Sequence, residues 1–266
     1  MACKRARNVM AMPIAKEAEA VQPKKEEAIK NERLLFGVQT SSPAYTLLQN
    51  NLTLFDWVTR NKMYPNFWGR NITGENSLTE KEVAFIRSKG CRIAMLFEGG
   101  EEKKTEQQGA LDAKKAVAAA EKLGCYSDAA IFLCVGEKNV TTDYLRGFAE
   151  AILLQAFTPG FKADTDSKSV FDREFSRGMQ TDKEVFSKCI IWAEAPALKE
   201  FERVTSTHFI HPDEYKPFAP SGTTRRDIAV WQYGKDCHPI YDDDDNEVTF
   251  NVELVRDDKI IIEKMF

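Results

Sequence analysis

The sequence lacks any apolar run near the roughly 20 residues that a membrane-spanning helix needs. Its longest apolar runs, AAIFLCVG and KCIIWAEAP, have the length of a buried strand. The N-terminal stretch MACKRARNVMAMPIAKEAEA contains a basic cluster but not the apolar core of a secretory signal. We therefore expect no membrane span and no classical secretion, which leaves the cytoplasm, or a virion or similar assembly, as the location.

The sequence also lacks the common motifs of metal, nucleotide and nucleophile sites. The six cysteines show no CxxC spacing, and neither a GxSxG elbow nor a phosphate-binding glycine loop is present. His208, His211 and His238 do not have the spacing of metal ligands, and the acidic run at residues 242–245 lacks the central glycine of a calcium loop. We therefore predict reduced, mostly buried thiols, no metal site and no cofactor.

Charge of one sign is not concentrated in the chain. The net charge is -4, and the 37 Lys and Arg residues are spread along the sequence rather than gathered in a stripe with aromatic residues between them. The charge pattern leaves nucleic-acid binding open only at the basic N-terminus. For the protein as a whole we expect no nucleic-acid partner.

With 266 residues, of which 43% are hydrophobic, the chain is long enough to bury one large core or two modest ones. Residues 1–33 stand apart from such a core, because they are rich in Ala, Glu and Lys, contain Pro23 and have few large apolar side chains. We predict an N-terminal arm here, either a solvated tail or an anchor onto a protein partner, followed by one domain over residues 34–266.

From Leu34 onward, strand-like and helix-like segments alternate. The strand-like runs are LLFGVQ, NFWGRNI, CRIAMLFEGG, AAIFLCVGEKN, KCIIWAEAP and DIAVWQYG. The helical patterns are TLLQNNLTLFDWVTRN, SLTEKEVAFIRSKG, QGALDAKKAVAAAEKLG and TTDYLRGFAEAILLQAF, whereas the stretch around GFKADTDSK is less regular. This order predicts an α/β protein, a (β/α)8 TIM-like barrel, regular or irregular, with a doubly wound sheet as the alternative.

Several segment ends are also predicted by the sequence. Thr79 is placed to cap a helix, with Glu82 three residues later, and Gly90 and Gly124 are placed to end helices. Near the C-terminus, EVTFNVELV alternates cleanly and is followed, after two aspartates, by KIIIEKMF. We predict a terminal β-hairpin from these two runs.

In such a barrel, functional side chains gather at the C-terminal ends of the strands. The candidates at those ends are Gln39, Arg70, Glu98, Glu137, Glu194, Gln232 and Tyr233, with Trp192 close by. Amides, carboxylates and aromatic rings in one cleft suit a carbohydrate ligand, and a pair such as Glu98 and Glu137 is what a glycosidase uses.

Five of these candidates have a structural alternative that the sequence leaves open, and for Glu98 and Glu194 it is a carboxylate without a functional role, in the case of Glu98 a solvated loop residue before Gly99 and Gly100. Glu137 precedes Lys138 and can form an exposed ion pair with it. Arg70 can brace the rim of the barrel, and Trp192 can pack in the core. The side-chain types therefore indicate a ligand but do not separate binding residues from packing residues.

The segments FGVQTSS, FWGRNI, LTEKEVAFIRSKGCRIAMLFE, GALDAKKAVAAAEKLG, AIFLCVGEKN and AVWQYG, followed by VTFNVEL, run in this order over residues 35–254. In order and spacing they resemble a family of glycoside-hydrolase-like barrels of unknown function, related to the family 25 lysozymes (N-acetylmuramidases) that cleave bacterial peptidoglycan. The resemblance implies the barrel fold and a cell-wall glycan as ligand. It adds Asn251, the asparagine of the family's terminal Asp-x-Asn pattern, to the ligand-binding candidates.

The resemblance also implies that acids have been lost. The family's first-strand aspartate falls on Gln39, a second falls on Gly136, and the terminal pattern is Thr249-Phe250-Asn251. An amide neither donates nor accepts a proton at neutral pH as a glycosidase carboxyl group must. Glu98 stands where the family has its third-strand acid.

We therefore predict a degenerate, non-catalytic barrel that binds a peptidoglycan-like glycan or serves as a structural or interaction module. Two alternatives remain. The first is an active peptidoglycan-type glycosidase that uses Glu98 and Glu137. The second is a structural component of a virion or an export apparatus.

Overall fold

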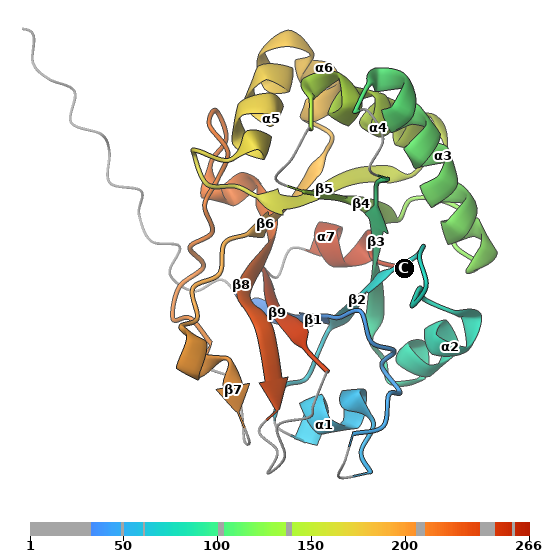
Figure 1. Ribbon diagram of the computed structural model, residues 1–266, viewed down its shortest axis with the longest axis vertical. Coiled ribbons are helices and arrows are strands. Elements are labelled where there is room, and N and C mark those ends of the chain that lie inside the picture. Colours follow the sequence, from blue (N-terminus) through green and yellow to red (C-terminus); the bar gives the residue numbers. More distant parts are fainter. Residues whose placement is uncertain are drawn as a thin grey trace, which may run out of the picture.

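Eight strands of the computed structural model close into a barrel (Figure 1). They are β1 (Leu34–Gln39), β2 (Phe67–Asn71), β3 (Arg92–Glu98), β4 (Ala130–Val135), β5 (Thr158–Asp164), β6 (Ile190–Glu194), β8 (Ile228–Pro239) and β9 (Phe250–Arg256). β1 to β6 pair in parallel in chain order, and β6 pairs in parallel with β8. β9 closes the ring because it pairs antiparallel with both β8 and β1. The predicted α/β barrel is confirmed.

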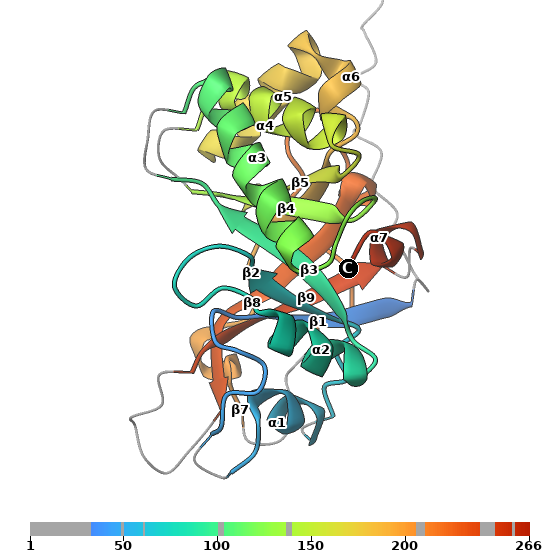
Figure 2. The ribbon, with the colours of Figure 1, turned by 90° about the vertical axis from the view of Figure 1, so that its right-hand side faces the viewer.

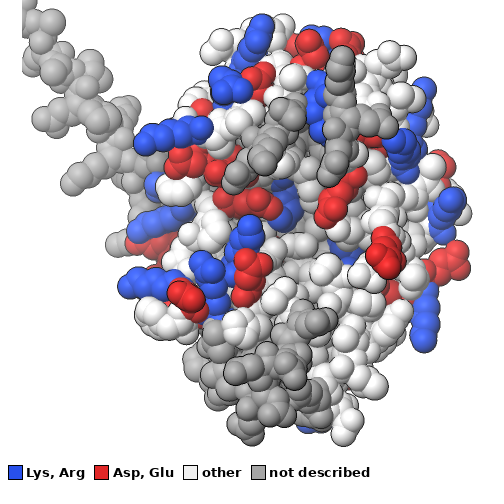
Figure 3. All heavy atoms as spheres, viewed as in Figure 1, with Lys and Arg blue, Asp and Glu red and all other residues white. Residues whose placement is uncertain are grey.

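The structure describes residues 33–48, 51–60, 62–100, 104–136, 140–205, 211–239, 248–256 and 259–266. The predicted N-terminal arm lies outside these ranges except for Arg33. On the face shown in Figure 3, the described acidic and basic side chains are interspersed. No helix in the described part of the chain is long and apolar enough to cross a membrane.

The helices cover the outside of the ring unevenly. They are α1 (Leu54–Arg60), α2 (Glu80–Ser88), α3 (Glu106–Lys122), α4 (Thr142–Leu154), α5 (Val170–Thr181) and α6 (Lys183–Phe186). Figures 1 and 2 show α3 to α6 gathered on one side, and α1 and α2 next to each other lower down. The described part of the connection from β6 to β8 holds only the short strand β7 (Val204–Thr205) and the 3-10 turns η1 (Glu200–Glu202) and η2 (Arg225–Asp227). The barrel is therefore irregular.

Helix starts follow local sequence signals. The hydroxyl groups at the N-caps accept hydrogen bonds from backbone N–H groups of the first turns, at Thr79, Thr105, Thr141 and Ser169. Gly90 and Gly124, predicted as helix ends, follow α2 and α3 with φ angles of 75° and 83°. The helix predicted around TLLQNNLTLFDWVTRN is shorter than expected, because the pairing of Leu47 with Thr53 precedes it.

The end of the chain corrects a prediction. EVTFNVELV does contain a strand, β9, but KIIIEKMF is not its hairpin partner and instead contains α7 (Lys259–Glu263). Both edges of β9 are already taken by β1 and β8. Met265 is instead buried with the side chains of the barrel interior, and Phe266 exchanges two backbone hydrogen bonds with Ile93 at the start of β3. The C-terminal residues therefore close the N-terminal end of the barrel.

Strand β5 and helix α5 were missed by the sequence patterns. Pro159 and Gly160 at the start of β5 are typical of turns, and Lys162 is a charged residue in the middle of the strand. Gly160 is needed for packing, because a Cβ atom there would lie 2.4 Å from the Phe132 ring. The polar residues of β5 face the barrel interior, where they contribute to the site described below.

Helices α3 and α4 approach each other closely at two glycines. A Cβ atom on Gly109 would lie 2.2 Å from the Tyr144 carbonyl oxygen, and one on Gly147 would lie 2.1 Å from the Glu106 carbonyl oxygen. Backbone atoms cannot move aside as a flexible side chain can. Contact at these glycines therefore sets the distance between the two helices.

We expect Gly147→Ala to lower the free energy of unfolding by about 1–3 kcal/mol, the usual cost of overpacking. The gain in helix propensity, about 1 kcal/mol at most, offsets this loss only partly. Urea unfolding measures the change. Gly100→Ala is the control, because a Cβ atom at Gly100 meets nothing within 4 Å. Equal stability of the two variants would contradict the close contact.

Candidate functional site

Side chains at the C-terminal ends of the strands point alternately into the barrel and outward. Gly69 and Trp192 mark the inward face, because a Cβ atom on Gly69 would lie 3.0 Å from Gln39 and 3.2 Å from Trp192. By this alternation, the inward polar residues nearest the mouth are Gln39, Asn71, Glu98, Asp164, Glu194, Gln232 and Asn251. Five of the predicted site residues therefore converge on the mouth of the barrel: Gln39, Glu98, Glu194, Gln232 and Asn251.

Three of these residues are joined as an amide cluster, defined as Gln39, Gln232 and Asn251. The Asn251 Nδ2 group donates to Gln39 Oε1 and to Gln232 Oε1, the second at 3.2 Å. The Asn251 Oδ1 atom accepts from the backbone N–H of Asp236 at 3.0 Å. Because the Asn251 amide holds three groups, the cluster fixes β1, β8 and β9 to one another at the mouth.

A buried cation lies on the inward face of β5. Lys162 is 6% exposed, and its ammonium group donates to Oε1 of Glu194, which is 31% exposed. Burial alone lowers the pKa of Lys162, but the negative charge of Glu194 reverses this effect and the pKa lies above its usual value. Lys162 is therefore charged at neutral pH, and one oxygen of Glu194 is committed to it.

Below the mouth, Glu253 and Trp192 form a buried polar contact. The Trp192 Nε1 group donates to Glu253 Oε2 at 2.9 Å, and both residues are 0% exposed. Burial raises the pKa of Glu253 to about 8, although Lys162 and the Trp192 hydrogen bond oppose the shift. Glu253 is thus largely protonated at neutral pH. Trp192, predicted as a ligand-binding residue, is fully buried under the mouth and has its indole N–H bound to Glu253.

Two other predicted ligand-binding residues face away from the mouth. Arg70 is fully buried on the outer face of β2, where its guanidinium group binds Glu82, the Thr40 carbonyl and the Asn76 carbonyl. Tyr233 is buried on the outer side of β8, and its hydroxyl group contacts His211 Nδ1 at 2.9 Å. Both residues stand near strand ends, as the sequence indicates, but their side chains lie on the outer side of the barrel, away from the mouth.

The two predicted catalytic carboxylates are Glu98, at the rim of the barrel, and Glu137. Glu98 ends β3 and is exposed, and its Oε1 atom accepts from Asn71 Nδ2 at 2.8 Å. Glu137 lies outside the described residues. Glu98 therefore has a neutral amide as its polar neighbour at the rim.

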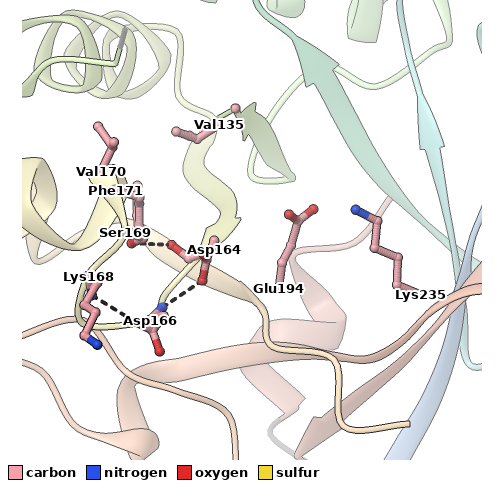
Figure 4. Close-up of a pocket in the computed structure, with 10 residues that line it drawn as sticks. Val135, Asp164, Asp166, Lys168, Ser169, Val170, Phe171, Glu194 and Lys235 are labelled. Carbon is pink, nitrogen blue, oxygen red and sulfur yellow. Dashed lines mark hydrogen bonds between the residues drawn. The ribbon is translucent and has the colours of Figure 1, made fainter. Parts of the chain in front are cut away.

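A pocket of about 480 Å³ opens at one side of the mouth, between the ends of β4, β5 and β6, the start of α5, and β8 (Figure 4). Its polar lining comprises Asp164, Asp166, Lys168, Ser169, Glu194 and Lys235. Asp164 and Glu194 are register neighbours on β5 and β6. Of this set, the sequence predicted only Glu194, because the others belong to the missed β5, to the loop and helix start that follow it, and to a bulged part of β8.

The pocket offers carboxylates, ammonium groups and a hydroxyl group, which suit a polar ligand with several hydrogen-bonding groups. In the described ranges, no group of three or more His, Cys, Asp and Glu side chains is arranged to hold a metal ion. The five cysteines in those ranges are free thiols. Burial raises the pKa of Cys134, which lies beside the pocket at the end of β4, to about 12, so it is not a thiolate nucleophile.

Comparison with known proteins gives the same architecture. The family model for the Rv2525c-like, glycoside hydrolase-like domain matches residues 63–246. No curated protein matches the chain. A solved structure of an uncharacterized B. stearothermophilus protein has a TM-score of 0.68 at 22% identity, covering 87% of this chain and 100% of that chain.

Two further structures are more distant in sequence. The Mycobacterium tuberculosis Tat-secreted protein Rv2525c, in complex with L-tartrate, has a TM-score of 0.52 at 12% identity, covering 85% of this chain and 96% of that one. A family GH25 lysozyme from Aspergillus fumigatus has a TM-score of 0.50 at 11% identity, covering 84% and 94%. At these identities the likeness shows the fold alone.

Proposed function

The chain belongs to the family of Rv2525c-like, glycoside hydrolase-like domains, which is related to the GH25 lysozymes, and we propose that it binds a glycan without hydrolysing it. Glycoside hydrolysis needs one carboxyl group that donates a proton and a second that acts as a base or a nucleophile. Hydrolysis therefore requires carboxyl groups at the mouth that are not already bound to other side chains.

The observation that carries the proposal is the amide cluster. Gln39 stands where the resemblance to the family 25 lysozymes implies an aspartate, and its Oε1 atom is occupied by Asn251. Glu194, one of the inward carboxylates at the mouth, is bound to the buried ammonium group of Lys162. Neither position presents an uncommitted carboxyl group, which disfavours proton transfer but leaves hydrogen bonding to hydroxyl groups intact.

A glycan is the ligand class that we favour for this mouth. The pocket at the mouth has the volume of a small-ligand site, and its lining contains both hydrogen-bond donors and acceptors. One structural relative is named a lysozyme. Cell-wall glycans and N-acetylglucosamine oligomers are therefore the first ligands to test.

We expect the purified protein to release no reducing ends from bacterial cell walls or chitooligosaccharides between pH 4 and 9, while an active GH25 lysozyme does so under the same conditions. Binding to the same glycans, measured by calorimetry, is expected without turnover. Glu98→Gln is the matched variant. Turnover by the native protein that Glu98→Gln abolishes would overturn the proposal in favour of a glycosidase.

A further inference from the structure

Strand β8 carries a bulge that turns Lys235 into the mouth of the barrel. Gln232 is opposite Glu253 on β9, but Gly234 is opposite Val252, so β8 has one extra residue over this step. Because successive side chains of a strand point to opposite faces, an extra residue reverses the direction of every side chain after it. Lys235 therefore points inward, and it lines the pocket.

A second irregularity holds this part of β8 in place. Gly234 is opposite Val252 and Cys237 is opposite Phe250, so that Lys235 and Asp236 together face the single residue Asn251. Asp236 has a φ angle of 54°, in the left-handed region that is unfavourable for most side chains. Its N–H group donates to Asn251 Oδ1, which ties the backbone next to Lys235 to the amide cluster. Strained backbone of this kind is concentrated at functional sites.

Some charged side chains of the pocket already have a hydrogen bond or an ion pair within the protein, and others do not. Glu194 is bound to Lys162, the Asp164 carboxylate accepts from the Asp166 N–H group, and the Asp166 carboxylate accepts from the Lys168 N–H group. Lys235 is exposed, and within the described residues it has no hydrogen bond or ion pair. Figure 4 shows its ammonium group directed across the pocket toward Glu194. Lys235 is therefore a positive charge at the pocket without an ion-pair partner, whereas Asp164 and Asp166, whose partners are backbone N–H groups, keep their negative charges.

We propose that Lys235 is the residue that selects the ligand by charge, and that the glycan bound here carries a carboxylate, as a uronic acid does. This inference rests on the proposed function, because it names the class of glycan that the same pocket takes. An ammonium group held at the wall of a partly enclosed pocket binds a carboxylate through a charge-assisted hydrogen bond. The sugar hydroxyl groups then meet the carboxylates of Asp164 and Glu194.

Calorimetry with two hexasaccharides tests the proposal. One alternates N-acetylglucosamine with glucuronic acid, and the other, chitohexaose, is neutral. We expect the acidic hexasaccharide to bind about tenfold more tightly, an effect between that of an exposed ion pair and that of an enclosed charge-assisted hydrogen bond. Lys235→Gln should remove this preference, and Lys235→Arg should retain most of it. Lys114→Gln, at an exposed lysine of α3, is the control and should change neither affinity.

The outcomes separate this inference from the proposed function. Equal binding of both hexasaccharides, unchanged by Lys235→Gln, would overturn the role of Lys235 and leave glycan binding standing. Binding of neither hexasaccharide would overturn both. A preference for the acidic hexasaccharide that Lys235→Gln leaves intact would assign the selection to another cation. The melting temperature of each variant shows whether it is folded.

Discussion

Replacing Arg70 with methionine is expected to lower the free energy of unfolding by about 3–5 kcal/mol, because it leaves a buried carboxylate without its cation. Arg70 and Glu82 are both 0% exposed, and their side chains are joined by hydrogen bonds of 2.8 and 3.3 Å. Glu82 keeps one other hydrogen bond, from the Ala44 N–H group at 2.8 Å. One neutral donor does not replace a guanidinium group in the interior.

Urea unfolding of the native protein and the variant measures this loss. Lys188→Met is the control, because Lys188 and Glu184 form an exposed pair 3.6 Å apart on the protein surface. Removing it should cost less than about 0.5 kcal/mol. Glycan binding by Arg70→Met, measured where the variant is folded, should match that of the native protein. Weaker glycan binding by a variant whose stability is unchanged would show that Arg70 contributes to the ligand site.

The pair of Arg70 and Glu82 also shows how far the sequence predicts the fold. Glu82 was assigned to a capping box with Thr79, and Thr79 does accept from the Glu82 N–H group at 3.2 Å. The Glu82 carboxylate does not return to the cap, because Arg70 binds it. Local signals such as caps and apolar runs are therefore predictable, whereas the partner of a polar side chain depends on elements that meet only in the fold.

The candidate site was predictable by position along each strand but not by face. Gln39, Glu194 and Gln232 were identified because they end strands, and they do point into the mouth. Arg70 and Tyr233 also stand at strand ends, but each is one residue away from an inward neighbour. A shift of one residue reverses the face of a side chain, so selecting the face requires the register of the neighbouring strands.

Lys235 was missed for a related reason. Its inward direction depends on a bulge in β8 that is defined only by pairing with β9. The polar residues of β5 were missed because Pro159 and Gly160 hide the strand, although Gly160 is required by the Phe132 ring. Both features come from contacts between distant segments, which local sequence patterns do not contain.

The second large effect is expected at Glu253, where Glu253→Gln should stabilise the protein increasingly as the pH rises from about 5 to 8. Burial is the main reason that the pKa of Glu253 rises from 4.5 to about 8. At a pH between these two values, Glu253 keeps its proton in the folded protein but releases it in the unfolded chain. The contribution of Glu253 to native stability therefore falls by about 1.4 kcal/mol for each pH unit in this range, and the loss is constant above it.

Glutamine removes this loss because it has no proton to release, while its amide oxygen still accepts from Trp192 Nε1. The difference in unfolding free energy between Glu253→Gln and the native protein, measured in urea at pH 5, 6, 7, 8 and 9, should grow up to pH 8 and then level off. Glu121→Gln, at an exposed carboxylate of α3, should show no such growth. A flat difference for Glu253→Gln would mean that Glu253 is ionised in the folded protein. In that case Lys162 would be shared between two carboxylates, and Glu194 would be less firmly held at the mouth.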